Sequence, residues 1–281
     1  MKRTFILSAT LLLPAITFAQ TEQEIRRILS DRIDIAKQSV GLVVGIIDQK
    51  GRRIISAGSL DQNDKRLLNG DTVFEIGSIT KVFTSLVLTD MVQRGEVALS
   101  DPIGKYLPKD LKTPERGGKA ITLLDLSTHF SGLPRLPGNL APRNPTDPYA
   151  DYSVENLYQF LTGYTLPRDP GEKWEYSNLG SGLLGHLLSL RAGSSYEAVV
   201  HSRITAPLRM KDTAVTLSPE MKARLAVGHN NNLAAVPNWN FQSLAGAGAL
   251  RSTANDMLTF LAANLGIVES PLAPADRKSV V

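Results

Sequence analysis

A serine and a lysine stand three positions apart in FEIGSITKVFTS, the stretch from Phe74 to Ser85. On an α-helix, residues at this spacing share one face and lie roughly 5 Å apart along the axis, so Ser78 and Lys81 can touch. A free serine is a poor nucleophile, and a free lysine, with a pKa of about 10.4, is protonated at neutral pH. Burial lowers the pKa of a lysine, which can then activate a neighbouring hydroxyl. The pair predicts a nucleophilic Ser78 activated by Lys81.

The position of Ser78 at the start of a helix would supply a second catalytic element. Free backbone N–H groups in the first turn can bind the oxyanion that forms when a carbonyl is attacked. Taken alone, the pattern also fits a capping serine followed by a solvated lysine. It is, however, the only Ser-x-x-Lys in the chain, and apolar residues on both sides favour its burial.

A second motif, Tyr176-Ser177-Asn178, lies 98 residues after Ser78 and is the only Tyr-x-Asn in the sequence. An adjacent ammonium lowers the pKa of a phenol, so a buried Tyr–Lys pair could share one proton and pass it from Ser78 to a leaving group. Asn178 could donate to the surroundings of Lys81 or to a substrate amide. The alternative is a turn in which Asn178 caps the following helix and Tyr176 only packs.

The elements that must position these residues follow from local patterns. A hairpin near the N-terminus and a long, mostly helical middle predict a mixed α and β architecture without regular βαβ units. Glycine and proline place a loop over 132–148. Gly246-Ala247-Gly248 reads as tight packing, not as a phosphate-binding loop. The expected elements begin with a helix over 22–38, preceded by a capping box at 21–24, a hairpin over 41–58, an extended run at 72–75, a helix from Ser78 to near Gly95 and a short helix in ITLLDLST. They continue with a helix capped by Ser153, one from Leu179 to near Gly193, one capped by Ser194, one that starts at Ser218-Pro219 with proline at the first helical position, and one over 254–264.

The N-terminus has the pattern of a secretory signal peptide. Lys2 and Arg3 precede the apolar run 5–16, and small residues lead to a cleavage site after Ala19. A buried N-terminal helix is the alternative interpretation. We therefore expect a signal peptide at 1–19, one domain at 20–281, and a periplasmic or secreted location. No later stretch is apolar and long enough to span a membrane, so stable membrane insertion is not expected.

Composition excludes several other classes of protein. The net charge of +4 becomes +2 without Lys2 and Arg3, and the basic residues are scattered, which argues against a nucleic-acid partner. The chain has no cysteine and therefore no disulfides. The four histidines show no metal-ligand spacing, so neither zinc nor another cofactor is expected. Gly-x-Ser-x-Gly and Ser-Asp-Asn are absent, which argues against Ser-His-Asp hydrolases and favours the Tyr-x-Asn branch of Ser-x-x-Lys enzymes.

Five stretches together resemble the serine penicillin-recognising family, which includes class C-type β-lactamases, D-alanyl-D-alanine carboxypeptidases and related esterases. They are FEIGSITKVFTS, ITLLDLSTHFSGLP, PGEKWEYSNLGSGLLGHLL, PLRMKDT and GAGALRSTANDMLTFLAANLG, in the order of that family. The resemblance implies an α+β fold, in which helices flank an antiparallel sheet beside a mostly helical lobe. It also implies that Ser78 is the nucleophile, Lys81 its activator, Tyr176 the proton carrier and Asn178 a substrate-binding donor.

One element of the family pattern is missing. No Lys or His followed by a small residue and Gly occurs near the C-terminus, and PLAPADRKSVV matches nothing in the pattern. In the family this strand completes the sheet and supplies the second oxyanion N–H group, whose loss costs roughly 10²- to 10³-fold in rate. The resemblance therefore leads us to expect a fragment that lacks the C-terminal strands, folds poorly alone and is nearly inactive.

Two classes of function remain open at the level of sequence. The first is an exported serine hydrolase that forms an acyl-enzyme on a small-molecule amide, with β-lactams preferred over cell-wall D-amino-acid peptides or esters. The second is a homologue that binds such ligands without turnover, an interpretation favoured by the missing third motif. The sequence does not fix the oligomeric state.

Overall fold

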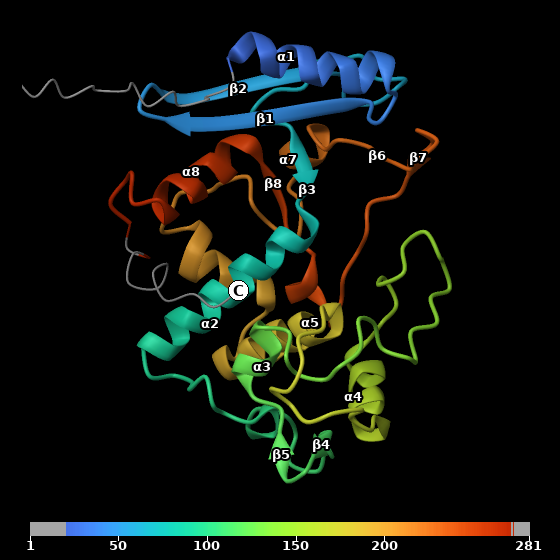
Figure 1. Cartoon of the computed structure of the whole chain (residues 1–281), viewed down its shortest axis with the longest axis vertical. Helices are drawn as coiled ribbons and strands as arrows, with labels where there is room; N and C mark the ends of the chain where they lie inside the picture. Colours follow the sequence, from blue (N-terminus) through green and yellow to red (C-terminus); the bar gives the residue numbers. More distant parts are fainter. Residues whose placement is uncertain (1–20, 271, 273–281) are drawn as a thin grey trace, which may run out of the picture.

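The computed structural model describes residues 21–270 and 272, and the expected signal peptide and cleavage site lie outside them. Figure 1 shows a hairpin layer at one end of the molecule and a larger, mainly helical body beneath it. Within the described residues the strands form four separate two-stranded antiparallel sheets. The expected α+β architecture is confirmed, with small antiparallel sheets and helices in one mixed fold.

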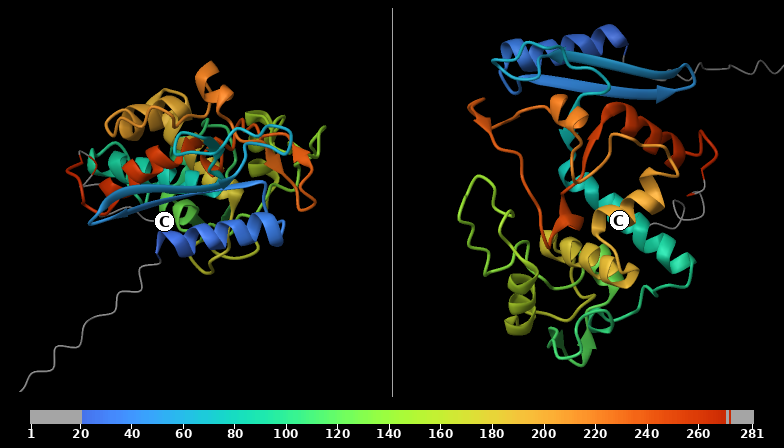
Figure 2. Two further views of the ribbon diagram at one scale, coloured as in Figure 1. Left: turned by 90° about the horizontal axis from the view of Figure 1, so that it is seen from above. Right: turned by 180° about the vertical axis from the view of Figure 1, so that it is seen from behind.

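The hairpin lies between two helices. Strands β1 (Gly41–Asp48) and β2 (Gly51–Gly58) pair in register from Gly41 opposite Gly58 to Asp48 opposite Gly51. Helix α1 (Glu22–Ser30) runs alongside it, and α8 (Ala254–Asn264) packs against β1 from the body (Figures 1 and 2). The capping box formed by Thr21 and Glu24 starts α1 as expected. The helix predicted over 22–38 is shorter, because the backbone widens into a π-type turn over 31–35.

The central helix α2 (Thr80–Gln93) crosses the body and is almost entirely buried. In the chain, α2 is preceded by β3 (Val73–Glu75) and a 3-10 turn over Gly77–Ile79. Helix α5 (Asn178–Ala192) packs against it, begins at the N-cap Ser177 and ends at Gly193 in the left-handed conformation. The predicted helix boundaries near 78–95 and 179–193 are therefore nearly correct.

The remaining helices and strands surround this central pair. The N-caps Ser153 and Ser218 are confirmed, the latter with Pro219 at the first helical position. The Ser194 cap is wrong: Ser194 donates its N–H to Ser189 O to close α5, and Ser195 caps the next helix. The remaining elements are the 3-10 turn Ile103–Lys105, β4 (Glu115–Arg116), β5 (Lys119–Ala120), α3 (Leu123–Ser127), α4 (Val154–Gly163), α6 (Tyr196–Val200), the π-turn His201–Thr205, α7 (Pro219–Ala223), β6 (Gly228–His229), β7 (Ala235–Val236), the 3-10 turn Ala245–Ala247 and β8 (Arg251–Thr253).

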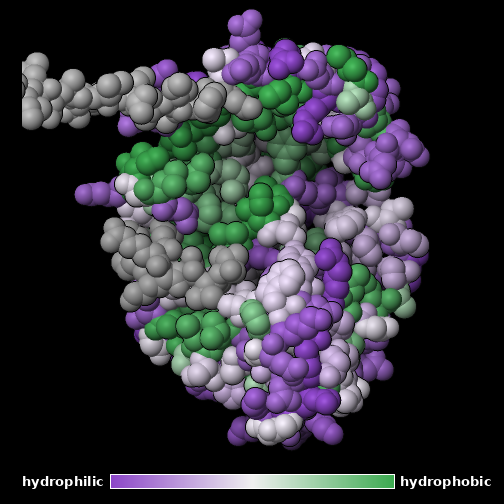
Figure 3. Space-filling view, in the orientation of Figure 1, coloured by the Kyte–Doolittle hydropathy of each residue, from purple (hydrophilic) through white to green (hydrophobic). Residues whose placement is uncertain are grey.

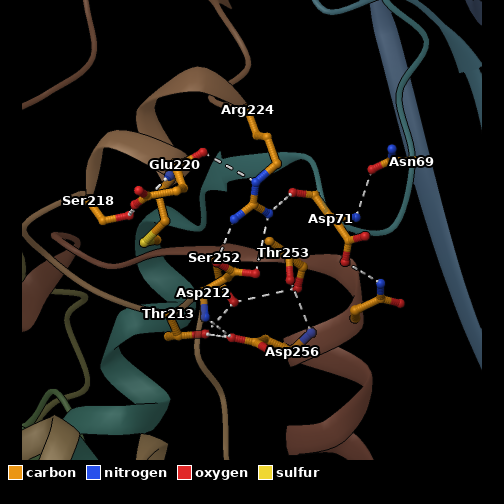
Figure 4. A network of polar contacts seen from close by, with 12 residues as sticks. Asn69, Asp71, Asp212, Thr213, Ser218, Glu220, Arg224, Ser252, Thr253 and Asp256 are labelled. Carbon is orange, nitrogen blue, oxygen red and sulfur yellow. Dashed lines mark hydrogen bonds and ion pairs between the residues drawn. The ribbon is translucent and has the colours of Figure 1, made fainter.

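A polar network fixes β8, the strand that pairs with β3 directly before Ser78 (Figure 4). The carboxylate of Asp256, in the first turn of α8, accepts a hydrogen bond of 2.8 Å from Thr213 Oγ1. Arg224 Nη2 pairs with Asp212 Oδ1 at 2.6 Å, and Arg224 Nη1 donates to Asp71 O. The network thus links α7, the start of α8 and the chain that leads into β3.

Hydrophobic side chains gather where the hairpin meets α8 (Figure 3). An apolar cavity of about 540 Å³ opens there between β1 and α8. Across the part of the chain that is described, none of the helices has both the length and the apolar character needed to cross a membrane.

Candidate active site

Ser78 lies at the exposed centre of the turn that joins β3 to α2. The sequence predicts it in the first turn of the long helix, whereas the α-helical hydrogen bonding begins two residues later, at Thr80. The preceding Gly77 has a φ of 49°, a value that residues with a Cβ rarely adopt. This turn presents the Ser78 hydroxyl to solvent at the N-terminal end of a buried helix.

Lys81 is buried, with 6% of its surface exposed. Its Nζ donates to Ser78 Oγ at 3.1 Å and to the carbonyl oxygen of Ala247 at 2.7 Å. Burial lowers the pKa of Lys81 below its ordinary value, and the positive charge of Arg135 adds to this effect, although Tyr176 opposes it. Contact between the serine and the lysine, expected from their spacing, is thus present in the fold.

Tyr176 completes the group, since its Oη lies 2.7 Å from Ser78 Oγ. Lys81 Nζ is 4.9 Å from the centre of the tyrosine ring, and the Arg135 guanidinium is 5.0 Å from it. Burial alone raises the pKa of the phenol, but the hydrogen bond with Ser78 and the nearby cations outweigh burial and lower it. The pKa values of both the tyrosine and the lysine are thus lowered from their ordinary values, and each group influences the other.

Asn178 and Ser78 line one cavity. Asn178 is the first residue of α5, and its Nδ2 donates to Tyr149 Oη at 3.3 Å. A cavity of about 310 Å³ is lined by Ser78, Asn178 and Tyr149 together with Trp239 and Phe241. The donor group of Asn178 is held by a tyrosine that the sequence did not single out, and its predicted role as a donor to a substrate stays a prediction.

Three aromatic side chains that line this cavity, those of Tyr149, Trp239 and Phe241, were not predicted from the sequence. The ring centre of Tyr149 lies 4.5 Å from that of Phe241 and 5.4 Å from that of Trp239. The loop that carries Tyr149 is held to the loop of Trp239 by Asp147, which accepts hydrogen bonds from Asn240 N and Nδ2. Nothing in the proline-rich stretch 132–148 has a period that would reveal this contact.

Gly246-Ala247 packs tightly, as predicted. A Cβ placed on Gly246 would lie 2.8 Å from Ser181 O and 2.9 Å from Gly185 Cα. This close approach to α5 brings the Ala247 carbonyl to Lys81, a role that the sequence did not indicate.

The histidines are dispersed, each with its own partner. His186 Nε2 lies 2.9 Å from Tyr158 Oη, and His229 Nε2 lies 2.8 Å from Asp61 Oδ1. Over residues 21–270, no three His, Cys, Asp or Glu side chains are arranged to hold a metal ion. His129 lies against the ring of Tyr176, and His229 is among the residues that line the cavity of Ser78 and Asn178.

Comparison with known proteins places the chain among serine hydrolases. The Beta-lactamase family model matches residues 18–279. The D-alanyl-D-alanine-carboxypeptidase/endopeptidase AmpH of Escherichia coli (strain K12) is 32% identical over 93% of this chain and 69% of its own length. A protein named Beta-lactamase from the same organism is 30% identical over 80% of this chain and 56% of its own length.

Solved structures agree with this assignment. A class C β-lactamase from Rhodobacter sphaeroides superposes with a TM-score of 0.75 at 28% identity, over 89% of this chain and 68% of the other. A β-lactamase/D-alanine carboxypeptidase from Yersinia pestis gives a TM-score of 0.71 at 30% identity, over 87% and 69% of the two chains. The fold, the spacing of its motifs and the family match lead to one conclusion: this chain belongs to the beta-lactamase family of serine hydrolases.

Proposed function

We propose that Ser78 is the nucleophile of an amide hydrolase and forms an acyl-enzyme with its substrate. The observation that carries the proposal is the contact of one exposed hydroxyl with both a buried amine at 3.1 Å and a phenol at 2.7 Å. These are hydrogen-bond distances over which a general base can take the serine proton. Lys81 activates Ser78, and Tyr176 carries the proton.

The chemistry proceeds in two steps. The Ser78 oxygen attacks the carbonyl carbon while its proton moves to the Tyr176–Lys81 pair, and Tyr176 then passes that proton to the leaving nitrogen as the C–N bond breaks. Water then attacks the carbonyl carbon of the resulting ester and gives a proton to the same pair. The bond from that carbon to Ser78 Oγ breaks, the pair returns the proton to Oγ, and the acid product leaves. The Asn178 amide binds the acyl part of the substrate in the cavity that it shares with Ser78.

The preferred substrate class is the β-lactams, because the strained ring of a β-lactam is a reactive amide and several relatives are named β-lactamases. The second candidate is a D-alanyl-D-alanine peptide, favoured by the similarity to AmpH. Both substrates use the same nucleophile and proton carriers, so the difference between the two activities lies in how fast water removes the acyl group.

The proposal extends to location and domain organisation. Residues 1–19 act as a secretory signal peptide, and residues 20–281 form one hydrolase domain in the periplasm or outside the cell. Mass spectrometry of the protein recovered after expression with its native N-terminus would give the cleavage site, which we expect after Ala19.

The test of the function is an acylation time course. The full chain is incubated with a fluorescent penicillin, and intact mass follows the gain and loss of one penicilloyl group on Ser78. Rapid loss of the group supports a β-lactamase; loss over hours, with release of D-alanine from a peptide that ends in D-Ala-D-Ala, supports a carboxypeptidase. The control, Ser78→Ala, should form no adduct. If the wild-type protein gains no penicilloyl group, leaves the penicillin intact and binds it as tightly as Ser78→Ala does, catalysis is refuted and a non-catalytic binding homologue is favoured.

A further inference from the structure

The segment that carries Tyr176 is fixed by the loop 129–135. Ser177 Oγ donates to Pro134 O at 2.6 Å, and Asn178 N donates to Arg135 O at 3.0 Å. These two contacts hold the C-terminal side of Tyr176, where α5 begins. The hydroxyl of Tyr176 itself has its hydrogen bond with Ser78, so the placement of that hydroxyl depends on how firmly its backbone is held.

His129 holds both neighbours of Tyr176 at once. Its carbonyl oxygen accepts the N–H of Glu175 at 2.8 Å, and its Nδ1 accepts the N–H of Ser177 at 3.2 Å. Its ring centre lies 4.7 Å from that of Tyr176, with 37° between the ring planes. One residue therefore contacts the tyrosine ring and the backbone on either side of it.

The backbone of His129 is itself unusual. Its φ of 64° lies in the left-handed region, which costs free energy for a residue with a Cβ. Such a conformation persists where the surrounding contacts determine it, and here those contacts are the two hydrogen bonds to the Tyr176 segment. To accept from Ser177 N, the Nδ1 atom must be unprotonated. Burial and the charge of Lys81 lower the pKa of His129, which favours the neutral ring.

We propose that His129, as a neutral hydrogen-bond acceptor, is the positioning residue that holds the Tyr176 hydroxyl against Ser78. The inference rests on the proposed function, because it gives His129 a purpose only if Tyr176 carries a proton. His129 does not reach the reacting atoms itself. It acts by fixing the tyrosine, and a displacement of about 1 Å at such a group costs up to about 10²-fold in rate.

Two substitutions separate the acceptor from the rest of the side chain. His129→Gly tolerates the positive φ but removes both the acceptor and the ring. His129→Asn also tolerates this backbone, and its Oδ1 stands in the place of Nδ1 as an acceptor. We expect acylation by a chromogenic cephalosporin to be about 10- to 100-fold slower in His129→Gly, with KM changed less than about 2-fold, and to be largely restored in His129→Asn.

A double-mutant comparison identifies the path of the effect. If His129 acts through Tyr176, adding His129→Gly to Tyr176→Phe should change the acylation rate less than about 2-fold, because the hydroxyl to be positioned is gone. The proposal would be overturned if His129→Gly slowed acylation as much in the Tyr176→Phe background as it does in the wild type. It would also be overturned if His129→Gly alone acylated at the wild-type rate. If Tyr176→Phe alone acylates normally, the proposed role of Tyr176 has failed, which is a different result from a failure of His129.

The pKa of the Tyr176 phenol provides a second measurement, which does not require the protein to turn over a substrate. With the hydroxyl released from Ser78 and Lys81, the pKa of the Tyr176 phenol should rise in His129→Gly and return towards its wild-type value in His129→Asn. Phenolate absorbance measured during a pH titration follows this change, and Tyr176→Phe identifies the signal. Thermal unfolding of each variant shows that the titrated protein is folded. An unchanged phenol titration in folded His129→Gly would overturn the inference.

Discussion

The lowered pKa of Tyr176 can be tested directly, because it distinguishes this phenol from every other one in the chain. The sequence has seven tyrosines. Burial raises the pKa of six of them above the ordinary value, and only Tyr176 has a lowered one. The six are Tyr106, Tyr149, Tyr152, Tyr158, Tyr164 and Tyr196. In an alkaline titration Tyr176 should therefore ionise first and contribute about one seventh of the total phenolate signal.

Replacing Lys81 with methionine should remove this early step. Lys81 Nζ lies 4.9 Å from the centre of the Tyr176 ring. At an effective dielectric constant of about 20, two unit charges at this separation interact by about 3 kcal/mol. Because Tyr176 is partly exposed, solvent screening makes the actual interaction weaker than this. Without the ammonium, burial becomes the dominant influence, so the pKa of Tyr176 should rise and its ionisation should merge with that of the other tyrosines.

The assay is phenolate absorbance in the near ultraviolet, recorded from neutral pH upwards on wild type, Lys81→Met and Tyr176→Phe. Lys81→Met keeps the length of the side chain but leaves Ala247 O without its donor, which costs about 1–3 kcal/mol. A thermal melt at each pH must therefore show that the variant is folded. An early step that survives in Tyr176→Phe, or that is unchanged in folded Lys81→Met, would show that the amine and the phenol are not electrostatically coupled.

Two further predictions concern stability. Gly246→Ala should lower the free energy of unfolding by about 2–4 kcal/mol in denaturant melts, because its new Cβ meets backbone atoms, whereas Gly163→Ala, with open space around the site, should change it by less than about 0.5 kcal/mol. Burial raises the pKa of Asp101, but hydrogen bonds from Lys105, Tyr106 and a backbone N–H outweigh it and lower the pKa to about 2. This carboxylate therefore stabilises the fold above its unfolded pKa of about 4. Asp101→Asn should be less stable by about 1 kcal/mol at neutral pH, and the difference from wild type should narrow as the pH falls from 4 towards 2; a difference that stays constant would contradict the assignment.

Local signals predicted much of the fold. Helix caps act within a few residues of themselves, so these helix ends could be predicted from the sequence. Examples are the N-caps Thr21 and Ser153 and the C-terminal Gly193. The prediction that Ser194 caps the next helix was wrong, and the reason is also local. Two adjacent serines could each begin the next helix, and the turn that closes α5 uses the first.

The contacts that complete the site could not be predicted in the same way. Ser78 and Lys81 meet because of helical spacing, but Tyr176 reaches them from 98 residues away through a turn that is held by the loop 129–135. Tyr149 and Trp239 approach each other across two irregular loops. Neither loop has a hydrophobic period, so their packing depends on specific polar pairs that only the three-dimensional structure reveals.

The partners of Lys81 are consistent with the proposal that this buried amine acts as a base. A carboxylate neighbour would stabilise the ammonium and raise its pKa. Among residues 21–270, however, Lys81 forms no ion pair: its Nζ bonds with the Ser78 hydroxyl and the Ala247 carbonyl, both uncharged, while Arg135 contributes a positive charge. The tight packing of Gly246 against α5 is what supplies the carbonyl in place of a carboxylate. The small-residue turn that seemed only to fill space therefore helps to keep the lysine within reach of its neutral form.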